Sequence, residues 1–440
     1  MPMNRDLGRR GVLKATGASV AALGLTAAGC GGDGGSGDAG NADGPATLRF
    51  AWWGGEPRAV KIKKAIALFE KKNPKIKIKP EFTDYQAFWE KFQTQASGGN
   101  PPDVFLNSVA FLAKYDKRGV LLDLKSQVDA GNLSLKNFRG GVETAGQVSG
   151  GKQVAVPVGA NTMSLVIDKK AWDKAGVEPK FGWTWDEYFK SLQTIQDKLK
   201  IAGDTGYAGV MYLYDLYLRQ NGKAFFKDGK LGFAQDDLTQ WWSDYYKRVK
   251  SGIVADPKKI EQVKPKSGLS AGLAGAEFTW DNFSVRYEGE GDSDYALAPI
   301  PTTDGKDTGQ YLGSLMLSIS TKCEAQAQAA KFIDFMVHDP EVGKVMGYDM
   351  GVLATDEQFD AYKPGAEADK AVVEANKGIA AYENEVEKAG VLGKITPHPS
   401  GADVVEAAFL RIAGDVANAK QKVPAAVKQF FSEAEAAFQA

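Results

Sequence analysis

Aromatic side chains stand next to charged ones in the segment Trp52-Trp53-Gly54-Gly55-Glu56-Pro57-Arg58. A sugar ring presents apolar C–H faces and many hydroxyls, so flat aromatic surfaces combined with charged hydrogen-bonding groups suit it. Successive side chains of an extended chain point in opposite directions. We therefore expect one of the two tryptophans to stack on a ligand, while Glu56 and Arg58 bind its hydroxyls; packing in the core is the alternative for either ring.

Further candidates of the same chemistry lie elsewhere in the chain. Trp280-Asp281-Asn282 joins a ring that could stack to two polar neighbours, the alternative being a buried Trp followed by an Asp that caps a helix. Asn107 and Asn161 carry amides that both donate and accept, although either could instead cap a turn. Tyr212 and Tyr214 could add rings unless they form a core stripe. The predicted ligand-binding residues are Trp52, Trp53, Glu56, Arg58, Tyr85, Asn107, Asn161, Trp280, Asp281 and Tyr311.

Catalysis finds little support in the sequence. Residues 268–272 match the G-x-S-x-G pattern of a nucleophile elbow, but the polar segment before them contains Pro265 and predicts no strand to present Ser270. We expect the start of a helix there instead. Glu56 and Asp281 could form the carboxyl pair of a glycoside hydrolase, yet carboxylates that only bind hydroxyls would look the same. We expect a binding protein with no catalytic residue.

Metals and cofactors are not expected either. His338 and His398 stand far apart in the sequence, and no C-x-x-C motif accompanies them. The acidic residues at 292–294 lack the rest of a calcium-binding loop. Neither a G-x-G-x-x-G fingerprint nor a P-loop is present.

The elements that must position the candidate residues alternate between strands and helices. Leu48 and Phe50 alternate with polar residues, apolar residues recur at helical spacing over 62–69, and a second alternation follows at 76–78. A helix over 85–96 and a buried strand over 103–106 come next. This order predicts an α/β fold with a largely parallel sheet, in which ligands gather at the carboxyl ends of the strands.

Two extended runs, 154–159 and 295–301, each carry a proline and suit a chain that crosses between lobes. They predict a chain that leaves a first lobe, builds a second and returns. Between them, Thr184-Trp185-Asp186-Glu187 forms a capping box that opens a helix, and 236–250 is a further amphipathic helix. Its Trp241 and Trp242 are expected in the core.

Composition limits the class of protein. The 440 residues, 43% of them hydrophobic, are enough for two cores. Lys and Arg number 54 against 55 Asp and Glu, which leaves no basic field for nucleic acid. The two cysteines, Cys30 and Cys323, do not indicate a disulfide scaffold, and we expect Cys323 to be a small buried residue.

The N-terminal segment has the plan of an export signal. Arg9-Arg10 precede Lys14 and an uncharged apolar stretch over 15–28, which is shorter than the roughly 20 residues of a membrane-spanning helix. The pattern resembles a twin-arginine signal followed by a lipobox, with Cys30 as the acylated residue. Glycine-rich residues follow to position 44 and predict a flexible leash with a reach of roughly 20 Å.

Taken in order, these motifs resemble the family 1 extracellular solute-binding proteins of ABC importers, especially the carbohydrate-binding ones. The resemblance runs over about 47–438 and includes the segments 88–103, 156–162, 167–176, 184–187, 275–280 and 351–353. Ile167-Asp168 stand where the family has Tyr-Asn. The resemblance implies two α/β lobes that close on a ligand, with Trp280 on the second wall, and a membrane permease as partner.

Together the residues and the resemblance predict a two-lobe fold of the type II periplasmic binding protein kind. Residues 1–29 form the signal peptide and 30–46 the linker; 47–157 with 300–348 form the first lobe and 158–299 with 349–440 the second. We expect an exported, monomeric lipoprotein, anchored through Cys30 to the outer face of the cytoplasmic membrane, that captures a sugar by hinge closure and delivers it to an ABC importer. A peptide or polyamine is the alternative ligand, and a secreted glycoside hydrolase the alternative activity.

Overall fold

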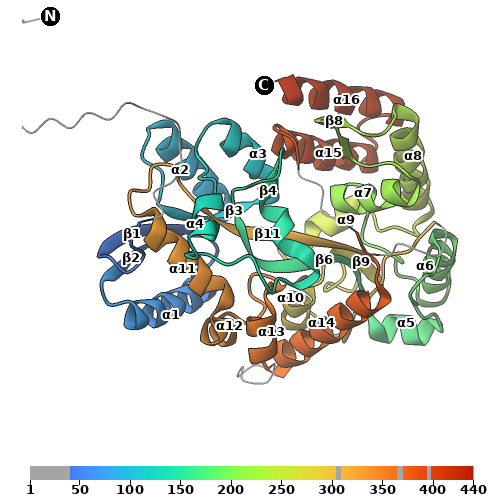
Figure 1. Cartoon of the computed structure of the whole chain (residues 1–440). Coiled ribbons are helices and arrows are strands. Elements are labelled where there is room, and N and C mark those ends of the chain that lie inside the picture. Colours follow the sequence, from blue (N-terminus) through green and yellow to red (C-terminus); the bar gives the residue numbers. More distant parts are fainter. Residues whose placement is uncertain (1–39, 304–308, 364–369, 394–397, 440) are drawn as a thin grey trace, which may run out of the picture. The chain divides into compact units, whose positions relative to one another are not determined.

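The computed structural model describes residues 40–303, 309–363, 370–393 and 398–439. Cys30 and the signal peptide lie outside them. The chain begins as an alternation of strands and helices, as the sequence predicts (Figure 1). These first elements are β1 (Ala46–Trp53), α1 (Glu56–Lys72), β2 (Ile76–Thr83), α2 (Tyr85–Ser97), β3 (Val104–Ser108), α3 (Val109–Lys117) and α4 (Lys125–Asp129).

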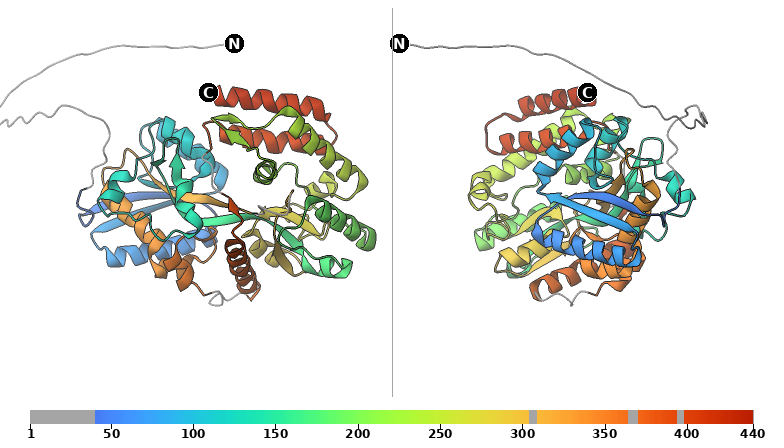
Figure 2. Two further views of the ribbon diagram at one scale, coloured as in Figure 1. Left: turned by 45° about the vertical axis from the view of Figure 1, so that its right-hand side comes forward. Right: turned by 90° about the vertical axis from the view of Figure 1, so that its left-hand side faces the viewer.

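β1 pairs with β2 and with β3, in both cases in parallel. Helices α1 and α2 link these strands and cover opposite faces of them (Figure 2), which is why residues such as Phe50 and Leu106 are buried. The resulting hydrophobic cluster, here called the first core, also contains Phe332 and Ile333 of a later helix, α11 (Gln326–His338).

The long strand β6 (Val156–Asp168) runs from this first core into another. Its residues Val156, Val158 and Ala160 belong to the first core, whereas Met163, Leu165 and Ile167 belong to a separate cluster, the second core. Nearly every β6 residue is buried because the strand has neighbours on both edges in each core. The elements around the start of β6 are η1 (Arg139–Gly146), β4 (Gln147–Val148) and β5 (Lys152–Gln153).

The second core is built mainly of helices rich in aromatic residues. A capping box at Thr184 and Glu187 opens α6, and Trp241 and Trp242 of α8 are both buried, so both predictions are confirmed. The elements are α5 (Lys169–Ala175), α6 (Trp185–Leu199), α7 (Met211–Gln220), β7 (Phe226–Lys227), β8 (Lys230–Leu231), α8 (Gln235–Ser251), α9 (Pro257–Gln262), β9 (Ala276–Trp280), α10 (Phe283–Glu290) and β10 (Tyr295–Ala298).

The chain returns to the first core through β11 (Gly309–Ile319), which pairs with β6 and β3. The run over 295–301 does not make this crossing, because β10 pairs with the distal end of β6 and Ala298 and Ile300 pack in the second core. The elements that follow are α12 (Pro340–Met346), β12 (Val352–Leu353), α13 (Asp356–Ala361), α14 (Lys370–Ala389), β13 (Leu392–Gly393), α15 (Ala402–Ala417) and α16 (Val423–Gln439). Of these, α15 and α16 pack in the second core, and the exact lobe boundaries remain predictions.

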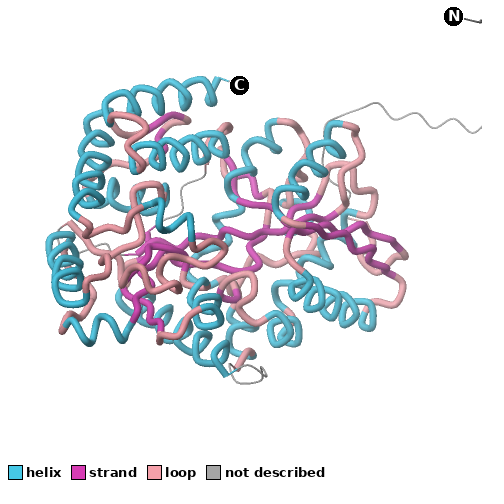
Figure 3. Tube along the Cα trace, turned by 180° about the vertical axis from the view of Figure 1, so that it is seen from behind, coloured by secondary structure: helices cyan, strands magenta, loops and turns pink. Residues whose placement is uncertain are grey.

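The main sheet is less parallel than we predicted. Its strand order is β10-β6-β11-β3-β1-β2, with β9 and β12 also paired to β6, and only the β1–β2, β1–β3 and β11–β13 pairings are parallel. The crossing strands β6 and β11 pair antiparallel with each other and, apart from the β11–β13 pairing, with all their other neighbours. Figure 3 shows these strands as a band with helices on both sides.

Candidate functional site

Tyr85 is the exposed member of an otherwise buried aromatic group beside the first core. It opens α2, whose first turn is capped by Asp84, and its side chain is 53% exposed. Its ring lies 5.5 Å from that of Trp53 and 6.4 Å from that of Trp89, and both tryptophans are buried. Trp89 in turn stacks on Phe111 of α3, with the ring centroids 3.9 Å apart. This packing holds the Tyr85 ring in place while leaving its surface free.

Tyr212 and Trp280 are partly buried rings that pack against both cores. Tyr212 lies on α7 and Trp280 ends β9, and their ring centroids are 5.1 Å apart. The ring of His398, which precedes α15, stacks on the Tyr212 ring with the two centroids 5.8 Å apart. These three rings therefore stand where the two cores meet.

Two carboxyl groups of α15 lie in the same region. The Tyr212 hydroxyl donates to Glu406 at 3.4 Å, and the Lys114 ammonium of α3 contacts Asp403 at 2.7 Å. Burial, together with the negative charges of Glu406 and Asp403, raises the pKa of Tyr85. Tyr85 and Lys114 lie on helices of the first core, whereas Asp403 and Glu406 lie on α15 of the second core. The Lys114–Asp403 ion pair and the effect of the two acids on Tyr85 therefore show that these helices approach one another here.

Burial decides the charge states at this place. It raises the pKa of the Glu406 carboxyl to about 7, with neighbouring Asp403 adding to the shift. It lowers the pKa of His398 to about 4, so the imidazole is neutral at pH 7. Aromatic faces with neutral or weakly charged acceptors are suited to a ligand that offers C–H faces and hydroxyl donors.

Three of the residues predicted to bind ligand lie at this place. Trp53, Tyr85 and Trp280 belong to it through the ring contacts above. Tyr311 pairs with Thr162 in the sheet, through the backbone of β11. Glu56 is exposed at the start of α1, 3.8 Å from Lys63.

The side chains of other predicted residues make contacts within the protein. Trp52 has no exposed surface, belongs to the first core and stacks on Phe82 of β2. Arg58 donates to Asp349 at 2.7 Å and to its backbone carbonyl at 2.9 Å, which fastens α1 to the segment before β12. These contacts stabilise the first core.

The two predicted amides and Asp281 are also buried. Asn107 lies in β3, where its amide donates to Ser318 of β11 at 3.1 Å and its Oδ1 accepts from the N–H of the next residue, Ser108. Asn161 is buried on β6 close to the backbone at Gly351. Asp281 has no exposed surface and faces another carboxyl group rather than the rings. Tyr214, held open as a further platform, is buried in the second core.

Sequence reasoning missed Trp89, Lys114, Asp403 and Glu406. Trp89 sits within an ordinary amphipathic helix, and Asp403 and Glu406 lie three residues apart on a helix some 290 positions away from Lys114. No recognised binding motif contains these residues. The spacing of the two acids on one helical face is the signal that was available.

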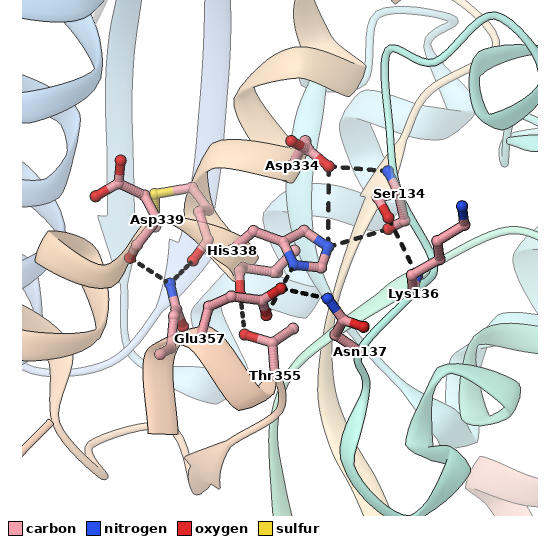
Figure 4. A network of polar contacts seen from close by, with 11 residues as sticks. Ser134, Lys136, Asn137, Asp334, His338, Asp339, Thr355 and Glu357 are labelled. Carbon is pink, nitrogen blue, oxygen red and sulfur yellow. Dashed lines mark hydrogen bonds and ion pairs between the residues drawn. The ribbon is translucent and has the colours of Figure 1, made fainter. Parts of the chain in front are cut away.

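His338 belongs to a separate polar network at the end of α11 (Figure 4). Its Nε2 lies 3.2 Å from the carbonyl oxygen of Ser134 and its Nδ1 lies 3.5 Å from Glu357, which also accepts from Asn137. Asp334 accepts from the Ser134 N–H at 2.8 Å. These contacts fasten the loop before η1 to α11 and α13.

Ser270 of the G-x-S-x-G segment takes part in different contacts. Its hydroxyl lies 3.1 Å from Glu290 and 3.1 Å from Ser267, in a turn rather than at the predicted helix start. Cys323 is buried, as predicted, and burial raises the pKa of its thiol to about 12. Among the described residues no cluster of three or more His, Cys, Asp or Glu side chains is arranged to hold a metal ion.

Two hydrophobic cores joined by crossing strands, with rings from both sides meeting beside the crossing, define the architecture of a solute-binding protein. Residues 53–341 match the model of the bacterial extracellular solute-binding proteins, and the chain belongs to that family. In the described part of the chain, no helix combines the length and the apolarity needed to span a bilayer.

Relatives and solved structures agree with this assignment. The diacetylchitobiose binding protein DasA of Streptomyces coelicolor is 27% identical over 327 residues, 70% of this chain and 72% of that protein. The multiple sugar-binding protein of Streptococcus mutans is 26% identical over 299 residues, 62% of this chain and 67% of its own length. A periplasmic oligogalacturonide binding protein from Yersinia enterocolitica shares the fold, with a TM-score of 0.72 at 19% identity over 90% of this chain and 99% of that one.

Proposed function

We propose that this protein captures a carbohydrate between its two cores and delivers it to an ABC importer. The observation that carries the proposal is that Tyr212, Trp280 and Glu406 lie where the two cores meet, while the exposed Tyr85 ring of the first core's side is close enough for the charge of Glu406 to raise its pKa. Rings stack on the C–H faces of sugars, and the carboxyl group accepts hydrogen bonds from hydroxyls. The carbohydrate ligands named for DasA and the Streptococcus mutans relative support the same class.

The mechanism that follows is closure about the crossing strands β6 and β11. A ligand favours the closed form only through its greater affinity for that form, and here that affinity comes from rings on opposite sides that a single sugar can contact together. The Lys114–Asp403 contact adds a direct bond between helices of the two cores. The protein binds without catalysis, as a monomer.

We also propose that the protein is exported and held at the outer face of the cytoplasmic membrane by a lipid on Cys30. The support is the order of twin arginines, apolar stretch and Cys30, followed by the glycine-rich leash. Labelled fatty acid should enter the protein in growing cells and should not enter the Cys30→Ala variant. Equal labelling of both proteins would show that Cys30 does not carry the lipid.

A thermal-shift screen of residues 40–440 tests the ligand class. The panel contains mono-, di- and oligosaccharides, peptides and polyamines. A ligand at 100 times its Kd adds about 2.7 kcal/mol of stability, enough to move the midpoint by a few degrees. A shift confined to one sugar class supports the proposal. A response to polyamines alone would contradict it and would indicate that Glu406 binds an ammonium group of a cationic ligand. Consumption of the sugar would indicate a hydrolase.

Glu406 should make sugar binding depend on pH. Its pKa of about 7 means that the carboxylate forms as the pH rises from 6 to 8. A charged acceptor binds hydroxyls more strongly than a neutral one, so we expect affinity to increase about fivefold over this range. Isothermal titration calorimetry of the wild type and of Glu406→Gln measures the effect, and the variant should show a flat profile.

Glu435→Gln is the matched control, since Glu435 is exposed on α16. It should retain the wild-type pH profile. A Glu406→Gln profile that follows the wild type would mean that another group titrates, and a wild-type affinity constant from pH 6 to 8 would place Glu406 outside the site.

A further inference from the structure

Two carboxyl groups meet inside the protein where the strands cross. Asp281 directly follows β9 and is 0% exposed, and Glu383 of α14 is 2% exposed. Both are tied to the middle of β6: the Asp281 N–H donates to the Thr162 carbonyl at 3.1 Å, and the Thr162 hydroxyl donates to Glu383. The pair therefore joins β6, the end of β9 and α14.

The hydrogen bonds of Asp281 leave one oxygen without a conventional donor. Its Oδ1 accepts from the backbone N–H of Asn282 at 2.7 Å. Its Oδ2 is buried, and no N–H or O–H of the described residues donates to it. The group within hydrogen-bonding reach is the carboxyl of Glu383. Two ionised carboxylates offer acceptors only, so a hydrogen bond between them requires that one of them carry a proton.

The charged groups around the pair do not neutralise it. Arg139 of η1 acts on Glu383, but its guanidinium contacts Glu387 of α14 at 3.1 Å and lies over the Phe359 ring. The Tyr382 hydroxyl donates away from the pair, to the Ala298 carbonyl at 3.3 Å. Four more acids line the cavity of about 690 Å³ that Tyr382 also borders: Glu288 of α10, Asp294, and Glu374 and Glu385 of α14.

We propose that Asp281 and Glu383 share one proton in the folded protein and that this proton fastens α14 to the crossing strands. Loss of the proton leaves two like charges in contact in a buried place, which loosens α14 from β6 and β9. The protein is thereby sensitive to alkaline pH at the place where α14 is joined to β6 and β9. This inference makes no use of the ligand, so it stands or fails independently of the proposed function.

The sign of the pH dependence follows from proton counting. Burial and the partner carboxyl raise the pKa of Asp281, and burial raises that of Glu383, so the folded pair keeps a proton that the unfolded chain releases above about pH 5. The free energy of unfolding must therefore decrease as the pH rises. For one retained proton, the unfolding equilibrium constant increases about tenfold per pH unit.

Glu383→Gln tests the shared proton. The amide can donate to Asp281 without titrating, so the variant should fold, and the tenfold-per-unit component should disappear from its urea unfolding between pH 5 and 8. Other buried acids, such as Asp204, contribute to both proteins and cancel in the comparison. The infrared carbonyl band of a protonated carboxylic acid should be present in the wild type and reduced in the variant.

Glu385→Gln serves as the control, because Glu385 is exposed two residues away on the same helix. It should keep the wild-type slope and infrared band. If Glu383→Gln unfolds with the wild-type pH slope, the pair does not hold the proton and the proposal is wrong. If that variant does not fold, Asp281→Asn decides by the same two measurements.

Discussion

Replacing Trp280 by alanine is expected to weaken binding of the ligand identified by the screen about 100-fold, which corresponds to about 2.7 kcal/mol. The ring is partly buried against both cores and lies 5.1 Å from Tyr212, so it can contribute a stacking surface that reaches a ligand from the second side. A large aromatic side chain dominates the binding energy wherever it is desolvated by the ligand. Calorimetric titration of Trp280→Ala and Trp280→Phe measures the loss, and the Phe variant should recover part of it.

The control for this loss is a ring outside the meeting place. Tyr246 of α8 lies beside Lys250, and Tyr246→Ala should bind ligand as the wild type does. Because Trp280 is not fully buried, Trp280→Ala should retain a cooperative unfolding transition and the wild-type circular dichroism spectrum. Unchanged affinity in a folded Trp280→Ala would remove this ring from the site and would leave Tyr85 and Tyr212 as the platforms to be tested next.

Replacing Gly159 by alanine is expected to destabilise the fold by about 3 kcal/mol. Gly159 lies on β6, opposite Leu353 of β12 on one edge and Leu315 of β11 on the other. A Cβ atom there would overlap the carbonyl oxygen of Met350 and would lie 3.2 Å from that of Val352. These are backbone atoms, so no side-chain rotation can relieve the overlap, and the segment that leads into β12 would have to move away from β6.

Urea unfolding followed by circular dichroism measures this destabilisation. Gly378→Ala is the control, since a Cβ atom at this exposed position of α14 meets nothing within 4 Å. Alanine is the better helix former, so this variant should be as stable as the wild type or slightly more stable. A Gly159→Ala midpoint equal to the wild-type midpoint would show that β6 and the segment before β12 are not in close contact.

Local patterns predicted the elements of the first core well. The alternation at Leu48 and Phe50 and the helical spacing over 62–69 depend on neighbours a few residues away, and the structure has the corresponding strand and helix; the capping box at Thr184 did the same for α6 in the second core. The direction of the strands was predicted less well. It depends on β6 and β11, whose partners lie far along the chain, and these two strands make most of the sheet antiparallel.

Placement of the candidate side chains shows the same division. The aromatic character of the site was visible in Trp53, Tyr85 and Trp280, and the exposed Tyr85 ring agrees with a ligand role. Whether a polar residue faces a ligand or the interior was not visible. Arg58 binds Asp349, Asn107 binds Ser318 and Asp281 meets Glu383, and each of these partners is more than 100 residues away.

The sequence by itself determined the class of this protein: two cores, an α/β plan, a lipoprotein-like N-terminus that remains a prediction, and the family to which the chain belongs. Hydrophobic periodicity, caps and motif order carry that information because they act over short stretches of chain. Only the tertiary structure decided which polar groups remain available. It brought Lys114 to Asp403 and Tyr85 near Glu406, and it buried Asp281 against Glu383, because such pairings arise from the packing of helices that no local pattern relates.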